Sequence, residues 1–290
     1  MNDWFDFSDA SMALLARADA GRALDEDLGT GDLTAGLVDP GQRSQARVLA
    51  REAAVICGQP WVEATLQRLD PQAELVWHVR DGQACNANQV ILEIRGNSRG
   101  LLSGERTLLN FLQLLSAVAT QTAAYVRAVE AVAGNHARIV DTRKTLPGLR
   151  LAQKYAVRCG GGSNHRIGLY DAVLIKENHI AAAGGVTAVL QRAAEVAARA
   201  TFVEIEVETL AQLEEALAAG AQMILLDNMD LVQLREAVRI TAGRAILEVS
   251  GGVGLDTVAG IAATGVDRIS IGALTKDIKA IDFSMRFTQL

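Results

Sequence analysis

The sequence contains few cysteines, and their placement excludes two kinds of site. Cys57, Cys85 and Cys159 are the three cysteines of the 290-residue chain, and no C-x-x-C pair occurs. An odd number of widely spaced cysteines supports neither a disulfide framework nor a zinc site. Half of the residues are hydrophobic, which is enough for a sizeable core. We therefore expect a globular protein of the reducing cytoplasm.

The chain also lacks the features of an exported or membrane protein. Its first ten residues, MNDWFDFSDA, are acidic where a secretory signal is basic, and no apolar stretch with a cleavage site follows. Residues 107–126 carry no charge and are long enough to span a bilayer. Polar residues nevertheless recur along one side of the helix that this stretch predicts: Asn110, Gln113, Ser116 and Thr120. We expect a helix buried in protein, with this polar stripe facing a cavity or a partner, and no membrane association.

Two kinds of pattern follow each other along the chain. Between about residues 43 and 96, short apolar or alternating runs separated by turn signals predict strands of a small α+β domain, and a long helical pattern follows from about Gly100 to Val132. After it, six short apolar runs alternate with helical patterns: RIVD, AVLIK, FVEIEVE, QMILLD, AILEVS and RISIG. Six such βα units predict a parallel sheet, closed or open, with helices outside it.

Each of the six apolar runs has a polar or small residue at its last position or two positions before it. These are Asp141, Lys176, Glu206, Asp227, Ser250 and Gly272. In a βα barrel the carboxyl ends of all strands meet at one face, where active sites are built. Any single one of these residues could instead cap a helix or face solvent. As a set, however, they carry unlike charges that are costly to bury unless they pair or meet a ligand.

Positive charge is concentrated in one segment of this acidic chain. The formal net charge is −6, yet residues 138–176 carry eight of the 28 Lys and Arg residues. This predicts a small ligand with several negative groups, because Arg binds carboxylate or phosphate in a bidentate manner and Lys supplies a point charge. Nucleic acid is the alternative, but the low pI and only two aromatic side chains in the segment, Tyr155 and Tyr170, argue against it. Three of these cations have the spacing of an ordinary solvated helix face: Arg150, Lys154 and Arg158.

Glycine-rich turns lie where an anion could bind. Ser250, Gly251 and Gly252 follow the fifth apolar run, and Ile271, Gly272 and Ala273 follow the sixth. Backbone N–H groups after the last strands of a barrel commonly bind phosphate, although such turns also serve as tight connections. A third glycine-rich loop, residues 160–166, leads into His165 and Arg166, which we expect to face the ligand. For His179 a structural role is the alternative.

Several long motifs occur in order, with ordinary spacing, from about residue 24 to near the C-terminus. They are EDLGTGDLT (26–34), ERTLLN (105–110), DTRKTLPGLR (141–150), KYAVRCGGGSNHRIGLYDAVLIKENHI (154–180), EIEVETL (204–210), LLDN (225–228), EVSGGV (248–253) and GVDRISIGALT (265–275). Together they closely resemble the quinolinate phosphoribosyltransferase family. The resemblance implies an N-terminal α+β sandwich-like domain at 1–112, joined by a C-terminal strand at 281–290, and an incomplete TIM-like α/β barrel at 113–280.

The resemblance also implies a reaction. Family members transfer a phosphoribosyl group from 5-phosphoribosyl 1-pyrophosphate to the ring nitrogen of quinolinate, and release carbon dioxide, pyrophosphate and nicotinate mononucleotide in NAD biosynthesis. Magnesium accompanies the pyrophosphate substrate, and no side chain of this chain is expected as a metal ligand. The cations of residues 138–176 are then counter-charges for a dicarboxylate and for phosphates. The expected assembly is a homodimer that binds neither nucleic acid nor membrane.

The family's site residues match positions of this chain. The resemblance implies that the quinolinate carboxylates and neighbouring phosphates are bound by Thr142, Arg143, Lys144, His165, Arg166 and Lys176. It implies a catalytic set of Lys144, Glu206 and Asp227, in which the two acids lie near the ribose hydroxyls and the magnesium. The turns 250–252 and 271–273 match the phosphate-contacting loops. Arg106 matches an arginine that reaches the active site of the other subunit.

Some residues depart from the family pattern, and other functions remain as alternatives. SAVAT at 116–120 stands where the family has SGIAT, and Lys276 and Asp277 replace a His-Ser pair near the phosphate loop, where they could alter pyrophosphate affinity.

A Schiff-base lyase using Lys144 or Lys176 is one alternative function. A non-catalytic or altered-specificity, molybdenum-related paralogue is another, although a binder of one anion would not need two acids. EDLGTGDLT also resembles the signature of the other phosphoribosyltransferase class, but helical spacing precedes it here.

Overall fold

The computed structural model describes residues 5–289 and divides into two compact units. The unit that we call the α+β unit comprises residues 5–123, 146–161 and the C-terminal residues from Asp277. The parallel-sheet unit comprises Ala124–Thr145 and Gly162–Lys276. The first four residues of the acidic N-terminus lie outside the described residues.

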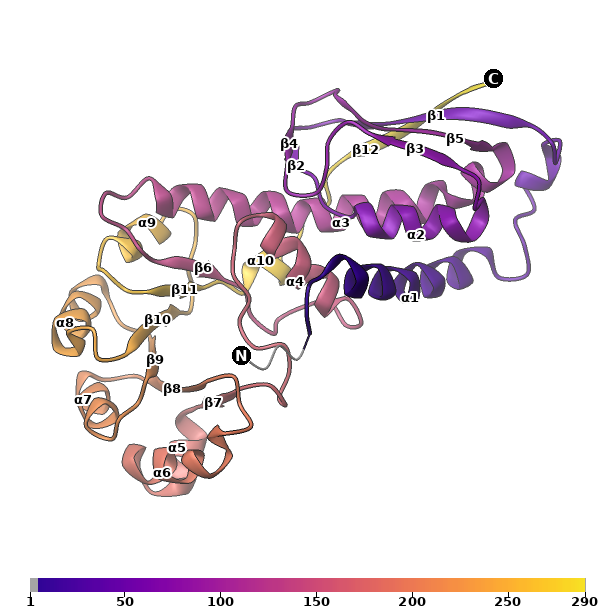
Figure 1. Cartoon of the computed structure of the whole chain (residues 1–290). Helices are drawn as coiled ribbons and strands as arrows, with labels where there is room; N and C mark the ends of the chain where they lie inside the picture. The colour runs from indigo at the N-terminus through magenta and orange to yellow at the C-terminus, as the bar shows by residue number, and fades with distance from the viewer. Residues whose placement is uncertain (1–4, 290) are drawn as a thin grey trace. The chain divides into compact units, whose positions relative to one another are not determined.

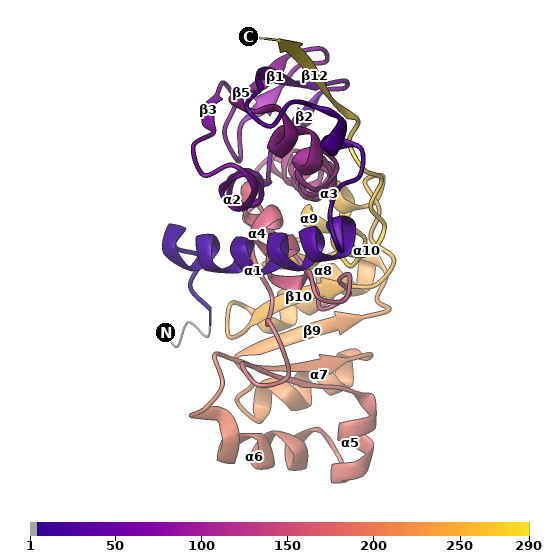
Figure 2. The same ribbon diagram turned by 90° about the vertical axis from the view of Figure 1, so that its right-hand side faces the viewer.

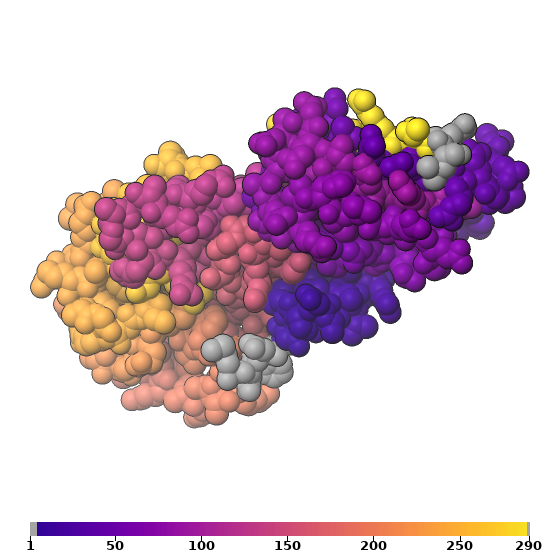
Figure 3. Space-filling view, turned by 45° about the horizontal axis from the view of Figure 1, so that its top comes forward, coloured from indigo at the N-terminus to yellow at the C-terminus, as the bar shows by residue number. Residues whose placement is uncertain are grey.

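Four antiparallel strands form the main sheet of the α+β unit (Figure 1). In pairing order they are β12 (Phe283–Gln289), β1 (Arg43–Ala50), β5 (Val90–Asn97) and β3 (Glu74–Trp77). Side chains alternate between the two faces of β1, so Ala46, Val48 and Ala50 are buried. The last strand of the chain, β12, pairs with β1, and its yellow residues lie against purple and indigo ones in the space-filling view (Figure 3).

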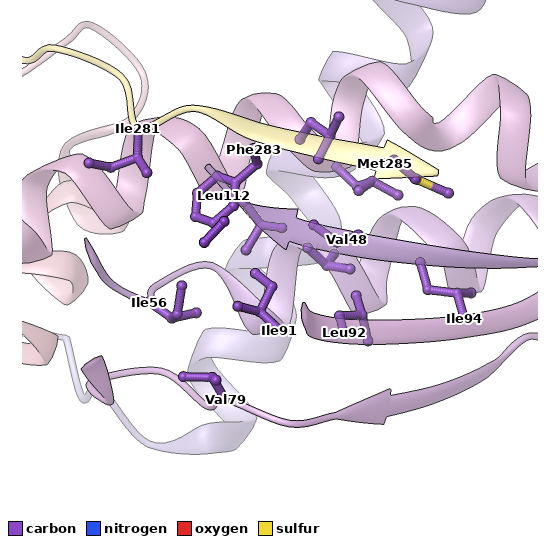
Figure 4. Packing of buried hydrophobic residues seen from close by; sticks show 14 of the residues in the cluster. Val48, Ile56, Val79, Ile91, Leu92, Ile94, Leu112, Ile281, Phe283 and Met285 are labelled. Carbon is purple, nitrogen blue, oxygen red and sulfur yellow. The ribbon is translucent and has the colours of Figure 1, made fainter. Parts of the chain in front are cut away.

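Helices cover one face of this sheet. The remaining elements of the unit are α1 (Asp9–Leu28), η1 (Ala35–Leu37), β2 (Ala54–Val55), α2 (Gln59–Leu69), β4 (Ala84–Cys85), the first part of α3 (Ser98–Glu130) and α4 (Arg150–Cys159). Figure 2 shows α2 and α3 between the sheet and α1. The core between sheet and helices includes Val48, Leu92, Leu112 and Phe283 (Figure 4).

The polar stripe of α3 binds backbone of its own unit. The side-chain oxygen of Ser116 accepts a hydrogen bond from the N–H of Cys57, and that of Thr120 accepts one from Val55. The predicted helix is confirmed, but the prediction that this stripe faces a cavity or a partner is wrong for Ser116 and Thr120. The sequence periodicity identified a polar face without identifying what covers it. Among the described residues, no helix is both long and apolar enough to cross a bilayer.

The basic residues of α4 differ in their surroundings. Arg158 is exposed and places its guanidinium 4.9 Å from the ring centroid of Phe7. Lys154, in contrast, is fully buried, so the prediction of a solvated basic face is wrong for this residue. The spacing of the three cations specifies one side of a helix, but it cannot specify whether protein or water covers that side. A lysine stem of four methylene groups also packs readily against apolar neighbours.

Six parallel strands form the sheet of the other unit. In pairing order they are β6 (Arg138–Val140), β11 (Arg268–Ser270), β10 (Ile246–Ser250), β9 (Met223–Asp227), β8 (Val203–Val207) and β7 (Val173–Ile175). Although β6 and β7 are consecutive along the chain, they form the two edges of the sheet, so the barrel is incomplete. Ser163 extends the β6 edge through a bridge to Val140. The predicted α/β fold, an α+β unit with an incomplete barrel, is confirmed.

Helices lie on the outer side of the curved parallel sheet (Figure 1). They are α5 (Glu177–Ala183), α6 (Val186–Ala197), α7 (Leu210–Ala218), α8 (Leu231–Thr241) and α9 (Val258–Ala262). A short helix, α10 (Ala273–Lys276), follows β11. Side-chain caps begin α7 and α8, where Thr209 and Asp230 accept backbone N–H groups of the first turn. Because the six strands pair in parallel, their carboxyl ends lie at one common edge of the unit.

We predict that the C-terminal strand is essential to the stability of the α+β unit. Phe283→Ala should lower the free energy of unfolding by about 3–5 kcal/mol, because it removes a buried aromatic ring from the core. Arg286→Ala, at an exposed position of the same strand, should change it by less than about 0.5 kcal/mol. Denaturant unfolding measures both values. Equal effects of the two substitutions would contradict the packing described for β12.

Candidate active site

A charged pocket lies at the carboxyl ends of the parallel strands. Its volume is about 330 Å³. Its lining residues are Thr142, Arg143, Lys144, His165, Arg166, Leu174, Lys176, Glu206, Leu225, Glu248, Ser250 and Ser270. The strand ends thus bring together side chains that are more than a hundred residues apart in the sequence. Four of the lining residues are Arg or Lys, which gives the pocket the charge that an anionic ligand requires.

The loop after β6 holds Lys144 at the pocket. The backbone N–H of Lys144 donates to the hydroxyl of Thr142 at 3.1 Å, and its carbonyl accepts from the hydroxyl of Thr275 at 2.7 Å. Gly272 leaves room for the lysine, because a Cβ at that position would lie 2.9 Å from Lys144 Cδ. A side chain at position 272 would therefore displace the outer part of the lysine side chain from its place at the pocket.

Two buried aspartates shape the glycine-rich loop that carries His165 and Arg166. Asp141 is fully buried at the end of β6, and its carboxylate accepts the backbone N–H of His165 at 2.8 Å and the amide of Asn164 at 2.7 Å. Asp171 accepts the N–H groups of residues 167 and 168 in the same way. Arg166 is thereby held at the pocket, where burial and the neighbouring Arg143 guanidinium lower the pKa of Arg166.

A lysine and a glutamate form the opposite wall. Lys176 Nζ lies 2.8 Å from Glu206 Oε2. The backbone N–H of Lys176 donates to Nδ1 of His179 at 3.0 Å, so His179 caps the start of α5. The structural alternative for His179 is therefore confirmed.

Apart from Ser250, the other residues predicted for the site are not among those that line the pocket. Asp227 ends β9, and its Oδ1 is 3.4 Å from where a Cβ of Gly251 would be. Gly251 and Gly252 are exposed and have positive φ values of 96° and 60°, which glycine adopts without strain. Ile271 is buried, and its N–H donates to the carbonyl of Val140; Gly272 and Ala273 follow it at the start of α10. Arg106 is an exposed residue of α3 within the α+β unit.

Sequence reasoning missed three charged residues, of which Glu248 lines the pocket and the other two do not. Glu204, Glu248 and Arg268 come from β8, β10 and β11, and both glutamates are fully buried. Nε2 of His165 lies 2.8 Å from Glu204 Oε2 and 3.5 Å from Glu248 Oε1. The guanidinium of Arg268 lies 2.9 Å from Glu248 Oε2. His165 therefore joins the pocket to a buried cluster of ionisable groups, which we call the buried charge cluster: His165, Glu204, Glu248 and Arg268.

The surroundings of the cluster raise the pKa values of its two glutamates. Burial raises the pKa of Glu204 to about 7, against opposing contributions from Arg268 and Arg166. Burial, followed by the charge of Glu204, raises the pKa of Glu248 to about 7. The two carboxylates therefore hold their protons far more strongly than ordinary glutamates.

A simple signal in the sequence could have found these residues. Side chains two positions apart in a strand point to the same face. Glu204 precedes Glu206 by two positions, Glu248 precedes Ser250, and Arg268 precedes Ser270. Selecting only strand ends identified the rim of the pocket and left out the layer below it.

Two groups of side chains have the spacing of metal ligands, with their potential ligand atoms within 4.8 Å of one another. They are Cys57, Asp81 and Cys159, and His165, Glu204 and Glu248. In the first group, burial raises the pKa of the Cys57 thiol, which opposes the thiolate form that metals bind. Asp81 accepts the N–H groups of Gly58 and Gln59 and the hydroxyl of Tyr155. In the second group, the Arg268 guanidinium already pairs with a carboxylate. We assign neither group as a metal site.

The fold and the pocket together define a class: incomplete α/β-barrel proteins with a pocket rich in Arg and Lys at the carboxyl ends of their parallel strands. Comparison with known families narrows this class. Residues 32–116 match the model of the quinolinate phosphoribosyl transferase N-terminal domain, and residues 118–286 match that of its C-terminal domain. The chain belongs to the quinolinate phosphoribosyltransferase family.

Individual relatives agree with this assignment. The chain is 41% identical to a probable nicotinate-nucleotide pyrophosphorylase [carboxylating] of Bacillus subtilis, over 91% of this chain and 90% of the relative. It is 43% identical to the nicotinate-nucleotide pyrophosphorylase [carboxylating] of Mycobacterium leprae, over 93% and 96% of the two chains. The solved structure of the Francisella tularensis nicotinate-nucleotide pyrophosphorylase superposes with a TM-score of 0.91, at 43% identity, over 95% of this chain and 97% of that one.

We predict that the buried charge cluster makes folding stability depend on pH. The folded chain holds a Glu204 proton up to about pH 7, whereas the unfolded chain loses it near the ordinary value of 4.5, so this contribution to stability is lost as pH rises between these values. From about pH 5 to about pH 8, the free energy of unfolding of Glu204→Gln should therefore rise relative to wild type by on the order of 1–3 kcal/mol.

Denaturant unfolding across this pH range measures the difference. The matched control is Glu214→Gln, which removes an exposed carboxylate from α7 and should follow the wild-type curve. A difference between Glu204→Gln and wild type that stays constant with pH would contradict the raised pKa of Glu204.

Proposed function

We propose that this protein is a carboxylating nicotinate-nucleotide pyrophosphorylase. It transfers the phosphoribosyl group of 5-phosphoribosyl 1-pyrophosphate to the ring nitrogen of quinolinate and forms nicotinate mononucleotide, pyrophosphate and carbon dioxide. The observation that carries the proposal is the pocket, in which Arg143, Lys144, Arg166 and Lys176 surround a space that also presents Glu206. Family membership and the names of the relatives support the same reaction.

The charges of the pocket match those of the two substrates. Quinolinate carries two adjacent carboxylates, and guanidinium groups bind carboxylates through two parallel hydrogen bonds. Arg143 and Arg166 suit this task because each presents a planar fork of donors, whereas Lys144 and Lys176 supply point charges. Thr142 assists from the loop after β6, and His165 lies deeper, with its ring nitrogens directed to Glu204 and to the Arg166 backbone.

The chemistry requires stabilisation of separating charges and no nucleophilic side chain. As the bond to pyrophosphate breaks, positive charge develops on the anomeric carbon, and the carboxylates of Glu206 and Asp227 stabilise it. Lys144 stabilises the departing pyrophosphate anion. When the ring nitrogen has bonded to the sugar, the pyridinium accepts the electron pair released as the adjacent carboxylate leaves as carbon dioxide. A proton then replaces carbon dioxide on the ring carbon.

The glycine-rich turns and magnesium are proposed to interact with the phosphate groups of 5-phosphoribosyl 1-pyrophosphate. Ser250 at the end of β10, the exposed residues Gly251 and Gly252, and the start of α10 after Gly272 follow the last strands of the sheet, where barrels commonly bind phosphate through backbone N–H groups. Magnesium accompanying the pyrophosphate substrate would neutralise part of its charge. Glu206 already pairs with Lys176, so we place the ion on the substrate and assign it no side-chain ligand.

The assembly and location of the protein stay predictions. We propose a homodimer in which Arg106 of one subunit reaches the pocket of the other. Its exposed position on α3 is compatible with such a role. A cytoplasmic location and the absence of a nucleic-acid partner rest on the sequence alone.

The alternative functions are less well supported. A Schiff-base lyase needs an amine that is free to attack a carbonyl group, whereas the amine of Lys176 is held in an ion pair with Glu206 at 2.8 Å. A molybdenum-related binder of a single anion would not need Glu206 and Asp227 together. Failure to turn over quinolinate, combined with borohydride trapping of a carbonyl compound on Lys144, would favour the lyase.

We predict that the purified protein, supplied with both substrates and magnesium, releases carbon dioxide in a quinolinate-dependent manner. Arg143→Ala should weaken quinolinate binding at least about tenfold, because a charge-assisted hydrogen bond contributes about 1.5–3 kcal/mol. Arg192→Ala, which removes an exposed cation of α6, is the matched control and should bind normally. Isothermal titration with quinolinate and a carbon dioxide assay give both measurements. Unchanged affinity in folded Arg143→Ala would contradict the placement of the substrate.

We also predict complementation between two inactive variants. If Arg106 acts across a dimer interface, Arg106→Ala and Arg143→Ala subunits should form mixed dimers in which one of the two sites is intact. Equal mixing after mild dissociation should restore about a quarter of the wild-type activity, since half of the dimers are mixed. Activity that stays at the level of the separate variants, in samples shown to contain mixed dimers, would exclude a role of Arg106 in the partner's site.

A further inference from the structure

The buried charge cluster lies directly under the proposed substrate pocket. Two of its members, His165 and Glu248, line the pocket, while Glu204 lies behind them and is fully buried. A nitrogen of His165 and one oxygen of each glutamate lie within 4.8 Å of one another. Two carboxylates this close together cannot both ionise freely, so the pair titrates as a unit.

The hydrogen bonds show where an additional proton can bind. Nδ1 of His165 accepts the backbone N–H of Arg166 at 2.8 Å, so the neutral ring carries its proton on Nε2 and donates it to Glu204. A second proton on the ring would oppose this backbone N–H. Oε1 of Glu204, in contrast, is buried and has no hydrogen-bond partner among residues 5–289. A buried oxygen without a donor stabilises a negative charge poorly, which makes it a suitable place for the proton.

When both glutamates are ionised and His165 is neutral, the four members of the buried charge cluster sum to a negative charge, although cations also lie around them. Glu204 is influenced by Arg268 of β11, by Arg166, by Glu206 of its own strand and by Lys176. Glu248 is influenced by Glu204, His165 and Arg268 and by the hydroxyl of Ser270. Within the cluster itself, two carboxylates face the single guanidinium of Arg268. A dicarboxylate entering the pocket would bring further negative charge toward this excess.

We propose that the Glu204–Glu248 pair is a proton-accepting site that takes up a proton when a doubly negative substrate binds in the pocket above it. The proposal rests on the proposed function, because it takes quinolinate as that substrate. The proton converts the pair from two negative charges to one, which removes the repulsion beneath the bound carboxylates. The pair is thus a positioning element: it acts on the substrate through His165 and through the field of the pocket. The raised pKa of each glutamate agrees with this role.

The first test measures proton uptake directly in the wild-type protein. Isothermal titration with quinolinate at about pH 7.5, in two buffers of different ionisation enthalpy, gives the number of protons bound with the ligand. We expect uptake of a substantial fraction of one proton. The dissociation constant should also increase as pH rises from about 7 to about 8.5, by up to about tenfold per pH unit, which is the limit for one linked proton.

Variants then assign the proton to the cluster. Glu204→Gln keeps an oxygen that can accept from His165 Nε2 but cannot bind a proton reversibly. Its proton uptake should fall close to zero, and at about pH 8.5 it should bind quinolinate more tightly than wild type. Glu248→Gln provides a second, independent test and should also reduce the uptake. Glu214→Gln, with its exposed carboxylate on α7, should keep the wild-type uptake and pH dependence.

The outcomes separate this inference from the proposed function. Binding of quinolinate without proton uptake would overturn the inference and leave the proposed function intact. Uptake that persists unchanged in both folded glutamine variants would also overturn it, because the proton would then bind elsewhere. If wild-type protein binds no quinolinate at any pH, the proposed function fails first.

Discussion

The parallel pairing of six short strands is the constraint on which the site depends. Because all six strands run in the same direction, their carboxyl ends meet at one edge and bring Lys144, Lys176 and Glu206 to one pocket. No local interaction between these residues could achieve this, since they come from separate βα units. The buried carboxylate of Asp141 then fixes the loop that carries His165 and Arg166, through two hydrogen bonds at the edge strand β6.

The pocket contains two layers with different electrostatic tasks. The upper layer is formed by exposed and half-buried cations, which in the proposed reaction would bind the substrate anions and stabilise the departing pyrophosphate. The lower layer is formed by buried glutamates and Arg268, where the low dielectric raises the pKa of each acid. Placing acids under an anion site appears unfavourable only while both are ionised. In the proton uptake that we propose, protonation of one of them removes this repulsion.

Much of the architecture could be predicted from the sequence, because it follows from periodicity. The alternating βα pattern predicted the parallel sheet, and the helical spacing before Gly134 predicted α3, which extends over Ser98–Glu130. The residues of the rim were also accessible to prediction, since they follow directly after apolar runs. The burial of Lys154 and the contact of Ser116 with the backbone of Cys57 could not be predicted. A sequence pattern shows which side chains share a face of a helix, but it does not show what covers that face.

The sequence by itself determined the elements, the family and the concentration of positive charge in residues 138–176, since these depend on neighbours along the chain. Tertiary structure alone decided which charges are buried and which meet. Glu204, Glu248 and Arg268 lie on three different strands, and only the lateral pairing of those strands places them around His165. Burial and distance set the energy of a charge, and both are properties of the folded chain.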